Sequence, residues 1–332
     1  MKRLFVVLII MIVGLLAAGC AGATGGGAPA AAPASQPNTL TAVKVDAVSL
    51  DANADYWNKA PKLAIDTKAA MEGNPDGPTV TLQAVYDNAA IAIRAEWADD
   101  TETLLKNAWT WDGSAFTKSG DEDRVMFAWP IGNNAEFSSK GCAAACHNTA
   151  ENYEEWWMGS DNESVRYDNW HWKSARTNAA GYADDQWWNV LADPTNFESS
   201  RRNDAKESGG YADNVNDEKS GPRYMSKNGT DAQLIMAGEE VELDLAALAA
   251  GDVIPGYVLS KAVGSRGDVE ASGVWADGKW VVVLRRVLDT GHDDDAVFTV
   301  GKPMPFGVSV VDNGGGVDHA TSPEVLTLQW NN

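Results

Sequence analysis

Histidine and cysteine are scarce in this chain of 332 residues, which holds four His and three Cys. So few thiols exclude a disulfide-stapled scaffold, and so few imidazoles leave little choice of metal ligands. Basic residues are also outnumbered, with 26 Lys and Arg against 47 Asp and Glu and a formal net charge of -21. Such an acidic surface disfavours nucleic acid as a partner. No Walker loop, G-x-S-x-G elbow or HExxH motif occurs, so the common hydrolase and nucleotide-binding signatures are missing.

The N-terminal segment is typical of an export signal. Lys2 and Arg3 precede the apolar run Leu4–Ala18, which is too short to span a bilayer comfortably. Small residues before Cys20 resemble a bacterial lipoprotein signal, so we expect residues 1–19 to be removed and Cys20 to be lipidated. Residues 20–39, mostly Ala, Gly and Pro, are expected to form a flexible tether. The protein is therefore predicted to be exported and membrane-anchored, facing the periplasm or the cell exterior.

The two remaining cysteines lie close together and are followed at once by a histidine. Cys142, Cys146 and His147 give the spacing C-x-x-x-C-H. The usual attachment motif for a c-type haem is C-x-x-C-H, in which both thiols bind the haem and the imidazole ligates the iron. The spacing here is one residue longer. We interpret it as a covalent haem c site with His147 as proximal ligand; a disulfide or a pair of free thiols is the alternative.

The remainder of the chain, residues 40–332, shows the pattern of short β-strands. Val80–Tyr86 and Ile91–Trp97 alternate apolar and other residues around a short polar turn, which indicates a hairpin. Asp277-Gly278 marks a second hairpin. Further strands are expected at Arg124–Trp129, Gln233–Ala237, Val269–Trp275, Trp280–Leu288, Phe306–Val311 and Val325–Trp330. The pattern predicts an all-β, antiparallel β-sandwich of immunoglobulin-like or carbohydrate-module-like type.

Two segments depart from that pattern. Val241–Ala250 is the best candidate for a short helix. Residues 178–232 are rich in Asn, Asp, Gly, Ser and Glu, and we expect a long loop or partly helical excursion from the sandwich there. Fourteen tryptophans supply large flat apolar surfaces, most of which we expect in the core.

Several stretches, in this order, resemble one known family. They are Asp51–Pro61, Glu96–Thr101, Glu122–Val125, a Trp-rich turn at Asp168–Arg176, and Gly273–Trp280 with Arg285 and Arg286. The family is the haem-binding domain of the ethylbenzene dehydrogenase gamma subunit and the related cytochrome c-552/DMSO-reductase-like proteins. The resemblance implies a β-sandwich that grips one haem and moves electrons for a molybdenum oxidoreductase of the DMSO reductase class.

The resemblance also bears on the axial ligands. Family members with b-type haem use Met and Lys, and this chain departs from both. Cys142, Cys146 and His147 stand where the Met would be, and His319 matches the position of the Lys. His319 is therefore our preferred second axial ligand. The other candidates are His171, His292, Met126, Met225 and Met236. With both axial positions filled by protein, no site would be left for a substrate, which favours electron transfer over catalysis.

Two further kinds of residue invite a role. Arg176 and Arg266 could hold haem propionates, although a surface ion pair in an acidic protein is the plainer expectation for each. His171, between two tryptophans, could do the same or act as ligand. The Asp-rich turns Asp99-Asp100 and Asp293–Asp295 carry carboxylates of the kind that bind Ca²⁺, but no EF-hand spacing is present and we expect solvated turn carboxylates instead.

Two other functions are consistent with these residues. A carbohydrate-binding lipoprotein built on a Trp-rich sandwich would use the CxxxC pair as a disulfide and need no haem. A catalytic haem enzyme would need an open iron position. We favour a non-catalytic, monohaem electron carrier whose partners are a redox protein, the membrane through the lipid anchor, and no nucleic acid.

Overall fold

The computed structural model describes residues 36–132, 134–141, 159–160, 163–190, 200–315 and 318–331. Almost all the regular structure in this part of the chain is β, as predicted. One 14-stranded sheet forms the body, and its main path runs in the order β11-β10-β9-β8-β20-β22-β1-β4-β5-β19-β18. Pairing is antiparallel except at β1, which runs parallel to both β22 and β4. The all-β class is therefore confirmed.

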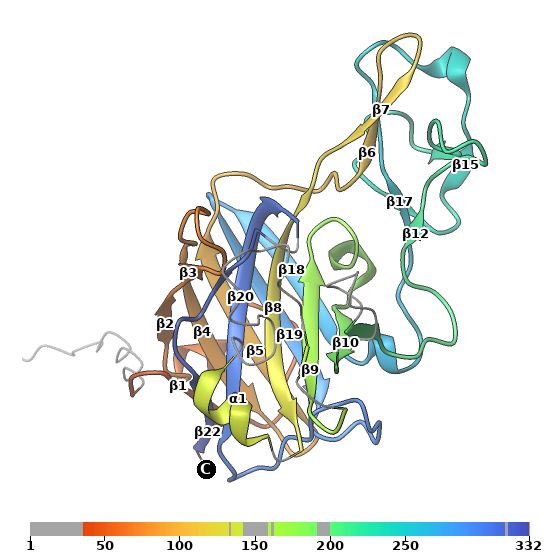
Figure 1. Ribbon diagram of the computed structural model, residues 1–332. Coiled ribbons are helices and arrows are strands. Elements are labelled where there is room, and N and C mark those ends of the chain that lie inside the picture. Colours follow the sequence, from red (N-terminus) through yellow and green to blue (C-terminus); the bar gives the residue numbers. More distant parts are fainter. Residues whose placement is uncertain are drawn as a thin grey trace, which may run out of the picture. The chain divides into compact units, whose positions relative to one another are not determined.

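The sheet folds over on itself, so that its two halves face each other (Figure 1). The β5 half contains β1 (Thr39–Lys44), β2 (Leu63–Asp66), β4 (Thr79–Tyr86), β5 (Ala90–Ala98), β18 (Glu270–Ala276), β19 (Lys279–Val287) and β22 (Leu326–Asn331). The β9 half contains β3 (Lys68–Ala69), β8 (Glu122–Ile131), β9 (Arg166–Lys173), β10 (Asp184–Trp188), β11 (Arg201–Asn203) and β21 (Ala320–Thr321). One long strand, β20 (Met304–Gly314), belongs to both halves.

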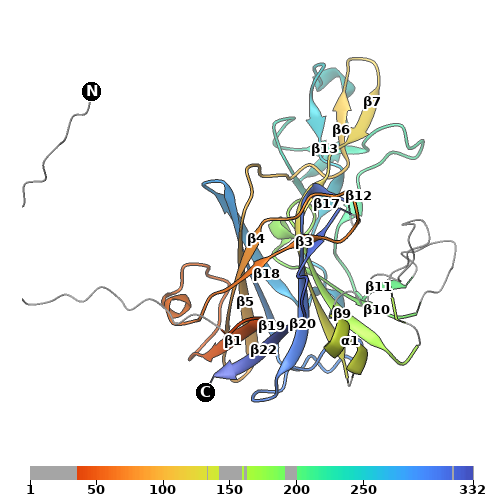
Figure 2. The same cartoon turned by 60° about the vertical axis from the view of Figure 1, so that its left-hand side comes forward.

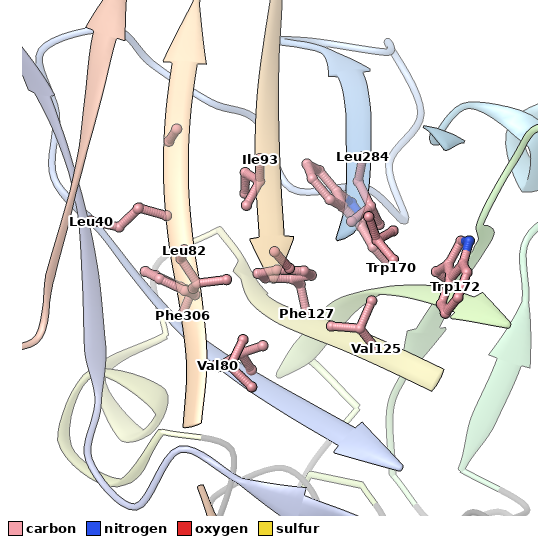
Figure 3. Packing of buried hydrophobic residues seen from close by; sticks show 14 of the residues in the cluster. Leu40, Val80, Leu82, Ile93, Val125, Phe127, Trp170, Trp172, Leu284 and Phe306 are labelled. Carbon is pink, nitrogen blue, oxygen red and sulfur yellow. The ribbon is translucent and has the colours of Figure 1, made fainter. Parts of the chain in front are cut away.

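Strand β20 joins the halves because it changes partner along its length. Met304–Phe306 pair with β22, whereas Gly307–Val311 pair with β8. Apolar side chains from both halves then meet in one core, shown in Figure 3. Its aromatic centre is Trp129, whose ring lies 4.9 Å from Phe306, 5.3 Å from Trp170 and 5.0 Å from Phe298. Most tryptophans of the described residues are core, as expected.

Both predicted hairpins are present. β4 and β5 meet at Asp87, whose Oδ1 accepts hydrogen bonds from the backbone N–H groups of Ala89 and Ala90, each at 2.8 Å. Asp277 and Gly278 connect β18 to β19 with φ of 53° and 72°. Positive φ at both central residues is what a two-residue turn of the hairpin type requires.

The segment before β2 covers the outer side of the β5 half. Its 3₁₀ helix η1 (Asp55–Asn58) buries Trp57 against Val85, Ala92 and Val283. Gln83 is buried there and donates through Nε2 to the carbonyls of Trp57 (2.6 Å) and Ala60 (2.8 Å). β4 and β5 are therefore buried on both faces, although their sequence alternates as a one-sided strand would.

A separate group of small sheets is formed by short strands from residues 108–119 and 212–259. The strands are β6 (Ala108–Trp111), β7 (Phe116–Ser119), β12 (Ala212–Asp213), β13 (Tyr224–Ser226), β14 (Ile235–Met236), β15 (Glu240–Glu242), β16 (Val253–Ile254) and β17 (Tyr257–Leu259). They form three sheets, β12-β17-β14, β13-β15 and β16-β6-β7, and gather away from the main sheet in both views (Figures 1 and 2). Their own small core contains Trp109, Met225 and Ile254.

Three expectations need correction. The helix expected at Val241–Ala250 is wrong: β15 ends at Glu242 and only the 3₁₀ turn η4 (Leu245–Ala247) follows, because Val241 pairs with Met225 and Leu245 stays exposed. The Trp-rich turn at Asp168–Arg176 is instead mostly strand β9. The excursion expected at 178–232 contains β10 and β11, which are edge strands of the main sheet, so only its later part leaves the sheet.

The remaining elements are short. They are the helix α1 (Ala135–Lys140) and the 3₁₀ helices η3 (Asn178–Ala180) and η5 (Ser265–Gly267). Asn134 caps α1 by accepting a hydrogen bond from the N–H of Phe137 at 3.0 Å, and Gly141 ends it with φ of 60°. None of the helices in the described residues is both long and apolar enough to cross a membrane.

Candidate functional site

The expected haem-attachment residues Cys142, Cys146 and His147, and the expected lipidation site Cys20, lie outside the described residues. What the structure describes is the surface next to the attachment stretch. Helix α1 and Gly141 lead directly into Cys142. Phe137 of α1 packs on Tyr167 of β9, with ring centroids 5.4 Å apart. Helix α1 therefore packs beside β9, whereas Gly141 at its end lies next to Val325.

β9 is unusual because every residue from Tyr167 to Lys173 is buried. Successive side chains of a strand point to opposite faces. Asp168, Trp170 and Trp172 face the core between the halves. The outer face carries four mostly polar side chains: Tyr167, Asn169, His171 and Lys173. Directly opposite His171 lie Met126 of β8 and Asp184 of β10.

His171 is held on one side only. Its Nδ1 lies 3.1 Å from Oε1 of Gln186, whereas Nε2 is buried with no hydrogen-bond partner among the described residues. Burial, together with the positive charges of Lys173 and Arg124, lowers the pKa of His171 well below its usual value. The imidazole is therefore neutral, which is the form that ligates a metal.

The other candidate axial ligands are scattered. His319 is half-buried in the loop before β21, where its carbonyl accepts a hydrogen bond from the N–H of Ala70 at 3.1 Å. His292 is exposed, and its Nδ1 lies 2.9 Å from Oδ2 of Asp268. It is therefore a solvent-facing turn histidine that pairs with a carboxylate. Met225 and Met236 belong to the small sheets around 212–259.

Both candidate propionate-binding arginines pair with carboxylates. Arg176 donates to Oε1 of Glu122 through Nη2 and through Nε, the latter at 2.8 Å. Arg266 donates through Nε to Oδ1 of Asp184 at 2.8 Å, and Lys173 donates to Oδ2 of the same carboxylate. We call Glu122, Lys173, Arg176, Asp184 and Arg266 the paired network.

The paired network is closed by an aromatic ring. Tyr211 lies against all three cations, whose charged groups are 5.3, 4.9 and 5.1 Å from its ring centroid. Burial alone would raise the pKa of Asp184, but Lys173 and Arg266 lower it to about 2. Each acid in this network therefore has a cation in contact.

A second buried group is dominated by acids. We define the acidic cluster as Asp168, Asp185, Asp204, Asp268, Asp294 and Asp295. Arg286 is buried among them. Its Nη1 donates to Oδ2 of Asp168 at 2.6 Å and to Oδ2 of Asp185 at 3.4 Å. Its guanidinium carbon lies 4.9 Å from the Trp170 ring centroid.

Two acids of this cluster, Asp185 and Asp204, have raised pKa values. Burial and the charge of Asp168 raise the pKa of Asp185 well above its usual value, although Arg286 opposes this. Burial and the charges of Asp294 and Asp295 raise the pKa of Asp204 to about 9.

The expectation of solvated carboxylates on both Asp-rich turns is wrong for one residue of each. Asp295 is 4% exposed because its carboxylate contacts the buried Arg286 and the hydroxyl of Thr290. Asp99 is 5% exposed because the β18–β19 hairpin covers it, and Nε1 of Trp275 donates to its carbonyl at 2.9 Å. No pattern in the sequence points to Asp168, Asp185 or Asp204 as partners of Asp295. Only the run Asp293–Asp295 was visible as a cluster.

Comparison with known proteins agrees with the resemblance noted above. Residues 54–322 match the family model described as ethylbenzene dehydrogenase. This range spans most of the chain, which therefore belongs to the ethylbenzene dehydrogenase family. No curated protein matches the chain.

Solved structures resemble it only distantly. A protein from Bacteroides uniformis ATCC 8492, described as carbohydrate-binding, has a TM-score of 0.40 at 10% identity and covers 88% of this chain and 99% of its own. A family 9 carbohydrate-binding module from Caldicellulosiruptor kristjanssonii, in complex with cellotriose, has a TM-score of 0.35 at 9% identity, with 89% and 95% covered. Likenesses this distant do not bear on function.

Proposed function

We propose that this protein is an exported, non-catalytic subunit or carrier that binds one haem c and transfers electrons to or from a molybdenum oxidoreductase of the DMSO reductase class. The observation that carries the proposal is the CxxxCH stretch, which lies inside the range that matches the ethylbenzene dehydrogenase family. When bound, the haem supplies the one-electron redox chemistry, and the polypeptide supplies attachment, axial ligands and a dry environment.

The described residues next to this stretch suit such a group. Gly141 is adjacent to Cys142, and Phe137, four residues earlier, packs on Tyr167 of the outer face of β9. That face offers His171, whose Nε2 is buried without a partner among the described residues. Asn169 adds a buried Nδ2 that is likewise unpartnered there. A buried polar atom without a partner is costly, which favours a group that would satisfy it.

Two histidines compete for the second axial position. His171 is favoured by its neutral state and by its Nε2, which has no partner among the described residues. His319, the ligand preferred from the sequence, is favoured because it matches the position of the Lys in the family. Met126, opposite His171, is a third candidate. Arg176 and Arg266 already pair with Glu122 and Asp184, so we assign them to the paired network instead.

Covalent attachment is tested by a pyridine haemochrome spectrum of the full chain, made in a host competent in cytochrome maturation. The wild type should give a c-type spectrum, and Cys142→Ala/Cys146→Ala should lose covalently bound haem. Cys20→Ala is the matched control: it should keep the haem and lose membrane association. A colourless wild type would overturn the proposal and leave the carbohydrate-binding alternative, which sugar-array binding would then test.

The axial ligand is tested on the same material. His171→Ala and His319→Ala should differ, and only the variant of the true ligand should convert the low-spin spectrum to high spin and allow carbon monoxide to bind the reduced protein. His292→Ala serves as the control and should leave the spectrum unchanged. If both variants keep a low-spin spectrum, neither histidine is the ligand and Met126→Ala becomes the next test.

A further inference from the structure

The acidic cluster holds far more negative than positive charge. The cluster has six carboxylates and one buried cation, Arg286, which contacts Asp168, Asp185 and Asp295, while His292 lies at the exposed rim beside Asp268. They come from five separate parts of the chain: β9, β10, the residue after β11, the residue after η5, and the loop that follows β19. Burying charge in this excess is unfavourable unless something positive or a proton compensates it.

A pattern in the hydrogen bonds shows where compensation is missing. Asp168, Asp185 and Asp204 each have one oxygen with a donor: Arg286 serves the first two, and Oγ of Ser265 lies 3.4 Å from Oδ2 of Asp204. The other oxygen of each, Oδ1, is buried and has no donor among the described residues. These three side chains are 0%, 0% and 3% exposed. An unpartnered, buried carboxylate oxygen is a vacant place for a cation or a proton.

The corner formed by Asp204, Asp294 and Asp295 suits a cation best. One oxygen of each lies within 4.8 Å of the others. Among the described residues neither Asp204 nor Asp294 takes part in an ion pair, whereas Asp168 and Asp185 already contact Arg286. Asp294 is half-buried, so the corner can be reached from solvent.

We propose that this corner binds one Ca²⁺ ion through the carboxylates of Asp204, Asp294 and Asp295. Oxygen atoms on opposite sides of a Ca²⁺ ion are about 4.8 Å apart, since Ca–O distances are about 2.3–2.6 Å. An all-oxygen set of ligands favours a hard cation over Zn²⁺, and an irregular set drawn from loops suits Ca²⁺ better than Mg²⁺. The ion would tie the loop after β19 to the β10–β11 edge of the main sheet.

The test uses the full chain after a chelator has removed bound metal. CaCl2 is titrated into this protein in a calorimeter at pH 8, and MgCl2 is titrated in a parallel experiment. One site should bind Ca²⁺ more tightly than Mg²⁺, and the melting temperature should be higher in Ca²⁺ than in chelator. Asp294→Asn should weaken Ca²⁺ binding at least about tenfold, because it removes a charged ligand. Asp312→Asn is the control: it removes a carboxylate from the separate group Asp99, Asp123 and Asp312, and binding should be unchanged.

A second variant distinguishes loss of Ca²⁺ binding from loss of folding. Burial and the charges of Asp294 and Asp295 raise the pKa of Asp204 to about 9, so this acid holds its proton at pH 8. Asp204→Asn should therefore leave the melting temperature in chelator unchanged, while the rise with Ca²⁺ should vanish. Equal melting of the wild type in Ca²⁺ and in chelator, with no heat of binding, would show that protons fill these places and would overturn the proposal. Loss of binding in Asp312→Asn with retention in Asp294→Asn would overturn it as well. The Cys142→Ala/Cys146→Ala variant should bind Ca²⁺ as the wild type does, which separates this site from the haem.

Discussion

Asp184 and Asp185 are neighbours on β10, yet they lie on opposite faces of the sheet in opposite electrostatic surroundings. Asp184 belongs to the paired network, where Lys173 and Arg266 contact it and its pKa falls to about 2. Asp185 belongs to the acidic cluster, where burial and Asp168 raise its pKa well above the usual value. Both side chains are fully buried, so burial alone does not decide the charge of either one.

The difference shows that two buried polar regions can affect the stability of the fold in different ways. In the paired network every acid contacts a base, and the arrangement fixes how β9, β10 and η5 pack. In the acidic cluster one arginine serves several acids, so the charge is unbalanced until another cation or protons arrive. A balanced group stabilises a fold by itself, whereas an unbalanced one makes stability depend on what binds.

Removal of Arg286, the buried cation of the acidic cluster, should have the largest effect. Arg286→Met leaves Asp168 and Asp185 without the cation that pairs with them, and breaking a buried pair in this way typically costs about 3–5 kcal/mol. We expect a strongly lowered urea midpoint or failure to fold. Arg285→Met, at the preceding position on β19, is the control because Arg285 is half-buried and, among the described residues, pairs with Glu270 alone, at 2.6 Å. Similar losses of stability in the two variants would show that the buried position of Arg286 among the acids makes no difference.

The next effect concerns acid stability. The pKa of Asp184 is lower in the folded chain than the usual 3.8, so its stabilisation is present above about pH 4 and is lost as the pH falls toward 2. The shift corresponds to about 2 kcal/mol at neutral pH. Asp184→Asn should lower the free energy of unfolding by at least this amount at pH 7 and flatten its decline below pH 4. Asp185→Asn should show neither change, and urea titrations at several pH values would compare them.

The smallest effect should come from a pair on the surface. Lys68 and Asp76 form an ion pair at 2.7 Å, but both side chains are 55% exposed. Water and salt screen such a pair, so Lys68→Ala should leave the melting temperature unchanged within error. A clear loss would mean that exposed pairs matter as much in this acidic protein as buried ones.

The fold was largely predictable where the strand period is plain. The hairpins β4–β5 and β18–β19 follow from alternation and turn residues. β9 was mistaken for a turn because Asn169, His171 and Lys173 look like solvent-facing residues. Their burial depends on partners such as Gln186 and Asp184, which lie beyond η3 and cannot be paired with β9 from sequence spacing.

The haem-attachment site stays a prediction, and of the acidic cluster only a local part is visible in the sequence. The CxxxCH stretch is contiguous and can be recognised directly. The acidic cluster joins Asp168 to Asp295 across most of the C-terminal half, and no periodicity links them. The sequence therefore pointed to turns with exposed acids, and only the packing of β9 and β10 against the loop after β19 revealed the cluster.

Strand β20 has a consequence for thermal unfolding. Its first residues are hydrogen-bonded into the β5 half and its later ones into the β9 half, so neither half can detach while that strand stays paired. Heat should therefore melt both layers in a single calorimetric transition, with van't Hoff and calorimetric enthalpies in agreement for the main sheet.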